Sequence, residues 1–128
     1  MYCLDTNIAV DILRGDVSIQ EKLARIKLQK LSITIITVAE LMKGAYLAQK
    51  PEAALSLVQK FIESVDVLPL STRACLLFGQ HQAQLNKKGT PVTDLDLLIA
   101  SIASCERKVL ITRDKNFKHI PEFQGEIW

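Results

Sequence analysis

Four acidic residues stand where carboxylates could come together in a folded chain: Asp5, Glu40, Asp96 and Asp114. Two carboxylates about 5 Å apart repel each other by roughly 3 kcal/mol at an effective dielectric constant of about 20. Repulsion among four of them would rival the ~5–15 kcal/mol net stability of a whole domain, so converging acids must hold protons or bind cations. An all-oxygen ligand set without Cys or His favours Mg²⁺ or Mn²⁺ over zinc.

A magnesium site of this kind suits the hydrolysis of a phosphodiester bond. Mg²⁺ keeps several waters and prefers one or two carboxylates together with a phosphate oxygen. The ion can activate a water as the nucleophile, so no histidine is needed as general base. His81 falls on an apolar helical stripe, which favours a hydrogen-bonded core or interface histidine over a catalytic one.

Each acid also has a purely structural interpretation as a helix cap. The helix macrodipole favours Asp and Glu in first helical turns, which accounts for Glu40 and Asp96. Capping does not require Asp5, which follows Leu4 at the tip of a predicted buried strand. Nor does it require Asp114, in the corresponding place after the last long predicted strand. These two acids therefore favour the metal-site hypothesis.

The elements that must position these acids are short strands that alternate with helices. Strands are predicted at 2–5, 32–37, 66–70 and 109–112. Helices are predicted at 8–13, 18–28, 37–45, 51–65, 71–88 and 95–105, with capping boxes at 18–21, 37–40 and 93–96. This alternation predicts a single domain over residues 1–128, a three-layer α/β/α fold with a short, mainly parallel sheet of four or five strands. Sites in such sheets lie where strands end and helices begin.

Four short motifs follow one another between residue 3 and about residue 118. They are Leu4-Asp5-Thr6-Asn7, Thr37-Val-Ala-Glu40-Leu-Met-Lys-Gly44, Asp96-Leu-Leu-Ile-Ala100 and Leu110-Ile-Thr-Arg-Asp114-Lys-Asn-Phe117. In this order they resemble the motifs of PIN-domain ribonucleases, in particular the VapC-like toxins of bacterial toxin-antitoxin pairs. The resemblance implies a PIN-like fold and a Mg²⁺- or Mn²⁺-dependent endoribonuclease that cuts structured RNA at an exposed loop. It also implies a homodimer and a cognate antitoxin protein that inserts a segment near the acids.

The same resemblance implies roles for individual residues. The four acids would form the catalytic, metal-binding quartet, and the family pattern of an acid three residues before Ile-Ala selects Asp96 rather than Asp94. Asn7 would orient the first acid of the quartet, and Thr112 would supply a supporting hydroxyl. Asn116 stands where the family often has a further acid. Because an amide is a neutral and weaker ligand, the number of metal ions, one or two, stays open.

The charge balance bears on how RNA could bind. The chain has 16 Lys plus Arg against 14 Asp plus Glu, a formal net charge of +2, which is far from the composition of a nucleic-acid-coating protein. Contacts with an RNA backbone must therefore come from local cations, and the candidates are Lys43, Arg113 and Arg14. Aromatic residues make up only 5% of the chain, so extensive base stacking is not expected.

Composition also bears on the compartment. No apolar run approaches the ~18 residues needed to cross a bilayer, so no membrane span is expected. The first residues lack the basic and apolar regions of a signal peptide, which predicts a cytoplasmic protein. The three cysteines, Cys3, Cys75 and Cys105, are an odd number at wide spacing. They are interpreted as small buried apolar residues in a reducing compartment.

Two other functions stay open on the sequence alone. An Asp at the tip of a first parallel strand is also where aspartyl-phosphate enzymes place their nucleophile, so Asp5 could serve a phosphatase. Such an enzyme usually has a second acid two positions on, where this chain has Asn7. The other alternative is a non-catalytic PIN-like scaffold that binds RNA or protein and whose acids serve as caps.

Overall fold

A five-stranded sheet lies at the centre of the computed structural model, which describes residues 1–26 and 31–128. Its strands are β1 (Tyr2–Leu4), β2 (Leu31–Thr34), β3 (Asp66–Leu68), β4 (Val109–Thr112) and β5 (Gly125–Ile127). They lie in the order β3-β2-β1-β4-β5, and each neighbouring pair is parallel. The predicted short, parallel sheet is therefore confirmed.

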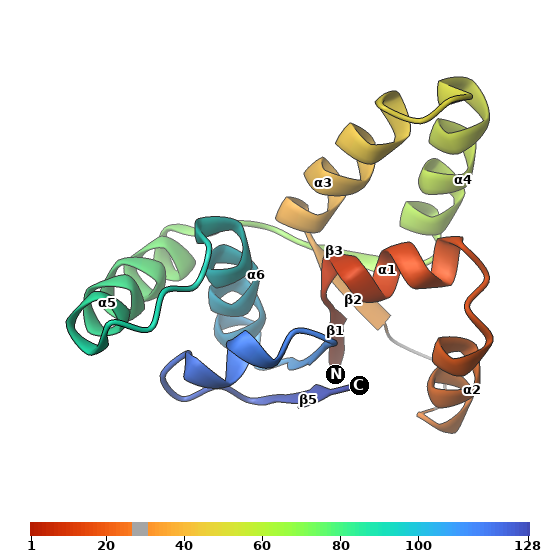
Figure 1. The fold of residues 1–128 in the computed structure, drawn as a ribbon. Helices are drawn as coiled ribbons and strands as arrows, with labels where there is room; N and C mark the ends of the chain where they lie inside the picture. Colours follow the sequence, from red (N-terminus) through yellow and green to blue (C-terminus); the bar gives the residue numbers. More distant parts are fainter. Residues whose placement is uncertain (27–30) are drawn as a thin grey trace.

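Helices cover both faces of this sheet (Figure 1). One face carries α1 (Thr6–Leu13), α2 (Val17–Arg25), α3 (Ile35–Tyr46) and α4 (Pro51–Glu63); the other carries α5 (Thr72–Lys88) and α6 (Asp94–Cys105). Successive strand residues point to opposite faces. Accordingly, Cys3 and Leu110 belong to the core beneath α5 and α6, and Leu4 and Ile111 belong to the core beneath α1 to α4. The predicted three-layer α/β/α architecture is confirmed.

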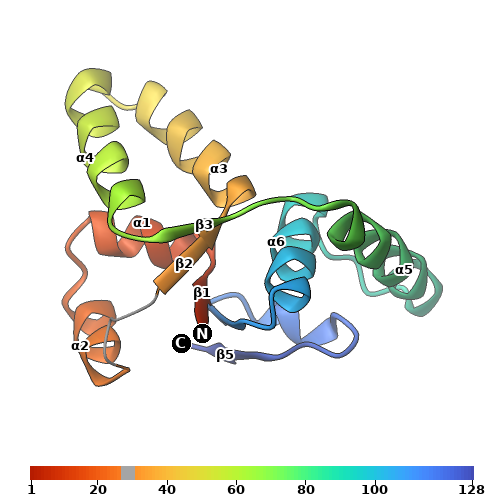
Figure 2. The ribbon, with the colours of Figure 1, turned by 180° about the vertical axis from the view of Figure 1, so that it is seen from behind.

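Two stretches near the end of the chain form elements that the sequence pattern does not predict. A 3-10 helix, η1 (Lys115–His119), follows β4, and β5 adds an edge strand beside β4. At the other edge of the sheet, the segment from β3 to α5 carries the chain across to the second face (Figure 2). The end of the predicted second helix, near Leu28, lies outside the described residues.

The register of the two central strands determines where the candidate site forms. Leu4 of β1 lies opposite Ile111 of β4. The next residue, Asp5, donates its backbone N–H to the carbonyl of Ile111 over 2.8 Å. Because the strands are parallel, the residues that follow β1 and β4 lie at the same edge of the sheet. Asp5 and Thr112 are thereby brought side by side, although 107 positions separate them.

The start of α3 differs from the prediction. The strand predicted at 32–37 ends at Thr34, and Ile35 and Ile36 are helical. The hydroxyl of Thr34 accepts the backbone N–H of Thr37 over 3.2 Å, so Thr34 is the N-cap and the capping box at 37–40 is wrong. Glu40 consequently lies beyond the first helical turn, where capping does not account for it.

Two other predicted capping boxes have different outcomes. The box at 18–21 is wrong, because α2 begins earlier and Asp16 caps it by accepting the backbone N–H of Ile19 over 3.0 Å. The box at 93–96 is confirmed at its N-cap: the Thr93 hydroxyl accepts the N–H of Asp96.

The expectation that capping does not involve Asp5 and Asp114 is also wrong. Asp5 caps α1, which starts directly after β1, and Asp114 caps η1, which starts directly after β4. Both helices begin where a strand ends, so one side chain can cap a helix and also face the sheet edge. The case for a metal site must therefore rest on what surrounds these acids rather than on the absence of a capping role.

The cysteines and His81 only partly match their interpretation. Cys3 is buried, but Cys105 is half-buried and Cys75 is exposed because it lies beside, rather than on, the buried stripe of α5. His81 is buried as expected, but its Nδ1 has no hydrogen-bond partner among the described residues. None of the helices in the described part of the chain combines the length and hydropathy needed to span a bilayer.

Candidate active site

Asp5 is the most enclosed acid of the candidate site. It is only 2% exposed and lies between the end of β1 and the start of α1. Its Oδ1 accepts the backbone N–H of Thr6 over 2.8 Å, and its Oδ2 accepts the hydroxyl of Thr112 over 2.7 Å. Both carboxylate oxygens are thus held by hydrogen-bond donors, which determines the orientation of the side chain.

The surroundings of Asp5 disfavour its charged form. Burial raises the pKa of its carboxyl from its usual range to about 6, and the charges of Asp96 and Glu40 also act to raise it. The hydrogen bonds from Thr112 and Thr6 lower the pKa, but they offset burial only in part. At neutral pH the carboxylate is therefore ionised in a place where negative charge is costly, a condition that a bound cation would relieve.

Glu40 reaches the same region from α3. Its Oε1 accepts the hydroxyl of Thr6 over 2.7 Å, and the Thr6 hydroxyl also lies 3.0 Å from that of Thr37. The sequence pattern predicts no role for Thr6 and only a capping role for Thr37. The available signal is the position of Thr6 directly after Asp5 in the first motif, but no sequence spacing indicates that its hydroxyl contacts Glu40.

Asp96 and Asp114 complete the group. Burial raises the pKa of Asp96, and the charges of Asp114 and Glu40 also act to raise it, while a hydrogen bond with Thr93 lowers it. Asp114 lies just beyond β4, where its N–H donates to the Thr112 hydroxyl over 3.0 Å. Asp5 is thus coupled by charge to Asp96 and Glu40, and Asp96 is coupled to Asp114 and Glu40. The four predicted acids form one group of interacting charges at one edge of the sheet.

The chemistry of this donor set fits a hard divalent cation. Within residues 1–26 and 31–128, no three His, Cys, Asp or Glu side chains lie close enough together to hold one ion directly. Mg²⁺ does not require such a cage, because it binds one or two carboxylates and keeps several of its waters. The mutual repulsion that acts to raise the pKa values of Asp5 and Asp96 supplies a reason for a cation to bind.

Comparison with known proteins identifies the family. The model of the PIN domain matches residues 2–123. This chain belongs to the PIN-domain family. It is 32% identical to the tRNA(fMet)-specific endonuclease VapC of Salmonella typhimurium, with 99% of this chain and 97% of that protein aligned. It is 34% identical to ribonuclease VapC1 of Haemophilus influenzae, with 100% and 98% aligned.

A solved structure supports the same conclusion about the fold. This PIN domain superposes on VapBC2 from Rickettsia felis, solved bound to a DNA fragment from their promoter, with a TM-score of 0.91. The two are 30% identical, and the match covers 99% of this chain and 98% of that one. The resemblance to VapC-like PIN domains, which rested on four motifs, is thus confirmed over the length of the chain.

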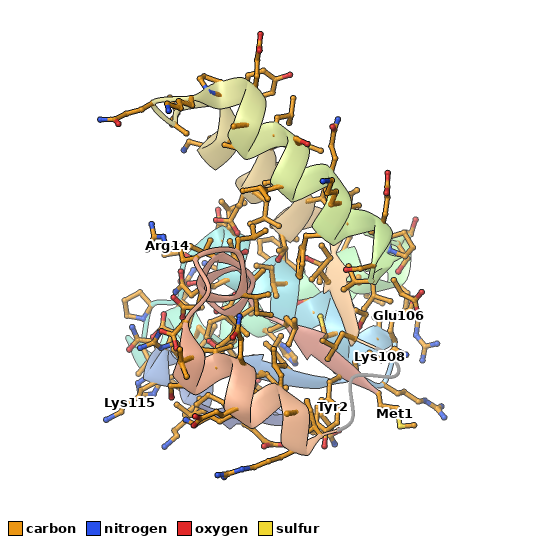
Figure 3. All side chains as sticks on the ribbon, turned by 90° about the vertical axis from the view of Figure 1, so that its right-hand side faces the viewer. Met1, Tyr2, Arg14, Glu106, Lys108 and Lys115 are labelled. Carbon is orange, nitrogen blue, oxygen red and sulfur yellow. The ribbon has the colours of Figure 1, made fainter. Side chains whose placement is uncertain are left out.

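The remaining predicted site residues of this PIN domain are exposed on the helices that carry or adjoin the acids. Asn7 is exposed in the first turn of α1, whereas the donors that hold Asp5 are Thr6 and Thr112. Lys43 is exposed near the end of α3. Arg14 is exposed at the C-terminal end of α1 (Figure 3).

Arg113, the third candidate for RNA contact, is already engaged within the PIN domain. Its guanidinium forms an ion pair with the carboxylate of Asp11 on α1. The Arg113 side chain is 48% exposed and that of Asp11 is 16% exposed, so the pair lies at the surface with the cation on the solvent side. Arg113 therefore ties the segment after β4 to α1, and any contact with RNA would use the remaining N–H groups of the guanidinium.

This pairing gives a test of Arg113 as an RNA contact. In an Asp5→Asn background, which is expected to leave the RNA intact, Arg113→Ala should make the slope of log binding constant against log salt concentration less negative by about 0.7, the value for one phosphate contact on a single strand. Fluorescence anisotropy with a labelled RNA measures the slope. Asp11→Ala is the matched control, because it removes the ion pair but keeps the cation. An unchanged slope for Arg113→Ala would mean that Arg113 does not contact the RNA and serves only in the ion pair with Asp11.

Proposed function

We propose that this PIN domain is a Mg²⁺- or Mn²⁺-dependent endoribonuclease and the toxin of a toxin-antitoxin pair. The observation that carries the proposal is the group of four interacting carboxylates, from separate parts of the chain, around buried Asp5, whose pKa is raised to about 6. The names of the relatives, an endonuclease and a ribonuclease, support RNA as the substrate. Asp5, Glu40, Asp96 and Asp114 are the proposed catalytic and metal-binding residues.

The residues of this chain have distinct tasks in the proposed reaction. All four acids would hold the ion, directly or through its waters, and the raised pKa values of Asp5 and Asp96 mark the places where negative charge is least favoured without it. The chemistry that a divalent cation would supply there is a water of lowered pKa as nucleophile and an offset to the charge of the phosphate. Thr112 and the backbone of Thr6 keep the Asp5 carboxylate oriented, and the Thr6 hydroxyl holds Glu40. Lys43 and Arg14 are available to contact the RNA backbone.

The proposal is tested by incubating the purified chain with total RNA. We expect fragments to appear with Mg²⁺ or Mn²⁺, to disappear when EDTA is added, and to return when excess Mn²⁺ is restored. A preparation of the Asp5→Asn variant made in parallel controls for contaminating nucleases. Equal cleavage with and without EDTA would rule out the metal mechanism.

The two alternative functions receive no support from the geometry. An aspartyl-phosphate enzyme usually has a second acid two positions after its nucleophile, where this chain has the amide of Asn7. Failure to trap a phospho-aspartate with a fluoride phosphate mimic is therefore expected. A scaffold whose acids served only as caps would not need Glu40, which lies beyond the first turn of α3.

The proposed protein partner is a cognate antitoxin. The similarity to VapBC2 supports it. So does an apolar groove of about 270 Å³ that opens beside Glu40. Its lining comes from α1, α3 and α4 and includes Val10, Leu13, Arg14, Leu41 and Val58. A segment laid in this groove would lie next to the acids, as the family resemblance implies.

We also propose a homodimer and a cytoplasmic site of action. Exposed Leu76 on α5, away from this groove, provides apolar surface for contact with a second copy. Light scattering on the purified chain measures the oligomeric state. A cytoplasmic site of action follows from the proposed substrate, because the RNA used in translation is in the cytoplasm.

A further inference from the structure

A short chain of hydroxyl groups runs into the candidate site from the inside of the protein. The Oγ1 of Thr37 lies 3.0 Å from the Oγ1 of Thr6, which lies 2.7 Å from the Oε1 of Glu40. Thr37 is fully buried on α3 and Thr6 begins α1, so these hydroxyl groups link two helices through residues that are 31 positions apart in sequence. It ends on one of the four proposed site acids.

The direction of these hydrogen bonds follows from the number of protons available. The single proton of the Thr6 hydroxyl goes to Oε1 of Glu40. The Thr6 oxygen must then accept, and the hydroxyl of Thr37 is its donor. Thr37 in turn is held by Thr34, whose hydroxyl binds the Thr37 backbone N–H rather than its side chain. The hydroxyl of Thr37 is thus left free to donate to Thr6.

Thr6 contacts a second acid through its backbone. Its N–H donates to Oδ1 of Asp5 over 2.8 Å, while its hydroxyl donates to Glu40. A single residue therefore determines the relative placement of two carboxylates that belong to different elements, one after β1 and one on α3. Hydrogen bonds to ionised acceptors are about twice as strong as neutral ones, which suits this task.

We propose that Thr6 is a positioning residue of the acidic site, and that Thr37 directs the Thr6 hydroxyl toward Glu40. The inference rests on the proposed function, because it concerns the readiness of the site for a cation. Removing an outer hydrogen-bond partner of a metal ligand costs about 10- to 100-fold in metal affinity or activity. The side chain of Glu40, without its donor, would no longer be held toward Asp5 and Asp96.

The experiment compares Mn²⁺ binding by variants of the full chain, measured without RNA by calorimetry and by the electron paramagnetic resonance signal of free Mn²⁺. Thr6→Val removes the hydroxyl but keeps the backbone N–H and the side-chain volume, and should bind Mn²⁺ about 10- to 100-fold more weakly. Thr6→Ser restores the hydroxyl and should restore most of the affinity. Thr37→Val should weaken binding by less than Thr6→Val, because the Thr6 hydroxyl can still reach Glu40.

The control is Thr90→Val, since the half-buried Thr90 hydroxyl has no hydrogen-bond partner within the described residues. It removes a threonine hydroxyl without touching the site and should leave Mn²⁺ affinity unchanged. The Mn²⁺ concentration that gives half-maximal cleavage of RNA should rise in Thr6→Val in parallel with the binding constant. If Thr6→Val does not fold, Thr37→Val tests the proposal instead, because the loss of the Thr37 hydroxyl must still lower the affinity for Mn²⁺.

The outcomes separate this inference from the proposed function. Mn²⁺ binding by the original chain with equal binding by Thr6→Val overturns the role of Thr6 alone. Equal loss in Thr6→Ser and Thr6→Val overturns it too, since the hydroxyl is then not the cause. Absence of Mn²⁺ binding by the original chain refutes both the inference and the metal mechanism.

Discussion

Replacing Asp5 or Asp96 with asparagine is expected to abolish RNA cleavage, lowering the rate by at least about 100-fold, the upper range for loss of an outer partner of a metal ligand. Each substitution keeps the size and shape of the side chain but removes one negative charge from the proposed cation site. The amide introduced at position 5 can still cap α1, since its oxygen also accepts a backbone N–H. Gel analysis of a labelled RNA in saturating Mn²⁺ measures the rate.

Asp94→Asn is the matched control for this prediction. Asp94 is exposed in the same first turn of α6 as Asp96, and residues two apart on a helix point about 200° from each other. Its loss should leave cleavage close to the original rate, as expected for a surface position. Cleavage at the original rate by Asp96→Asn, or an equal loss in Asp94→Asn, would contradict the assignment.

The second large effect concerns stability in the absence of metal. The pKa of Asp5 is about 6 in the folded chain against about 3.9 in an unfolded one. The folded state therefore binds the proton more tightly, so the contribution of Asp5 to stability is greatest below pH ~4 and is lost as pH rises through ~6. The shift corresponds to a loss of roughly 3 kcal/mol in the free energy of unfolding.

Asp5→Asn cannot ionise and should escape this loss. In EDTA, urea unfolding across the range from about pH 4 to about pH 8 should show the stability of the variant rising relative to the original chain by up to roughly 3 kcal/mol. Asp94→Asn should stay parallel to the original chain. Mn²⁺ added in excess of EDTA at the alkaline end should then raise the melting temperature of the original chain more than that of Asp5→Asn, because the variant lacks one of the four charges of the proposed site. Parallel curves for Asp5→Asn and the original chain would show that burial does not disfavour the charge of this carboxylate.

The proposed site holds a carboxylate in position for a cation, and this lowers the stability of the metal-free fold. The enclosure of Asp5 by β1, α1 and Thr112 disfavours its charge when no cation is present. The same enclosure orients the carboxylate and keeps it ready for a cation. Asp5→Asn is accordingly expected to give a more stable protein that does not cut RNA, a combination that a purely structural role for Asp5 would not produce.

The fold class and the four acids were accessible from the sequence because local patterns encode them. Strands of a few apolar or β-branched residues alternate with amphipathic helices, and this alternation predicts a parallel sheet with helices on both faces. Acids at the ends of strands and near the starts of helices then share an edge of the sheet, as Asp5 and Asp114 do. The order of the motifs further identified the family, which the match over residues 2–123 confirms.

The ends of helices and strands, and the hydrogen-bond partners, were harder to predict, because nearby residues compete for the same capping role. Thr34 and Thr37 can each cap a helix, and only the packing of β2 beside β1 and β3 determines that the strand ends at Thr34. Similarly, Asp16 and Ser18 compete for the start of α2, and Asp16 is the cap. The strand β5 has little signal of its own and forms because β4 offers an open edge.

By itself, the sequence determined the kind of residues at the site and the family to which the chain belongs. Only the tertiary structure decided how those residues are held: Thr112 on Asp5, Thr6 on Glu40, and Asp11 on Arg113. The physical reason is that the contacting residues are far apart in the sequence. These contacts join positions 107, 34 and 102 residues apart, and a hydrogen bond forms only within about 3 Å. No local pattern encodes such proximity; it arises when β1, β4, α1 and α3 pack together.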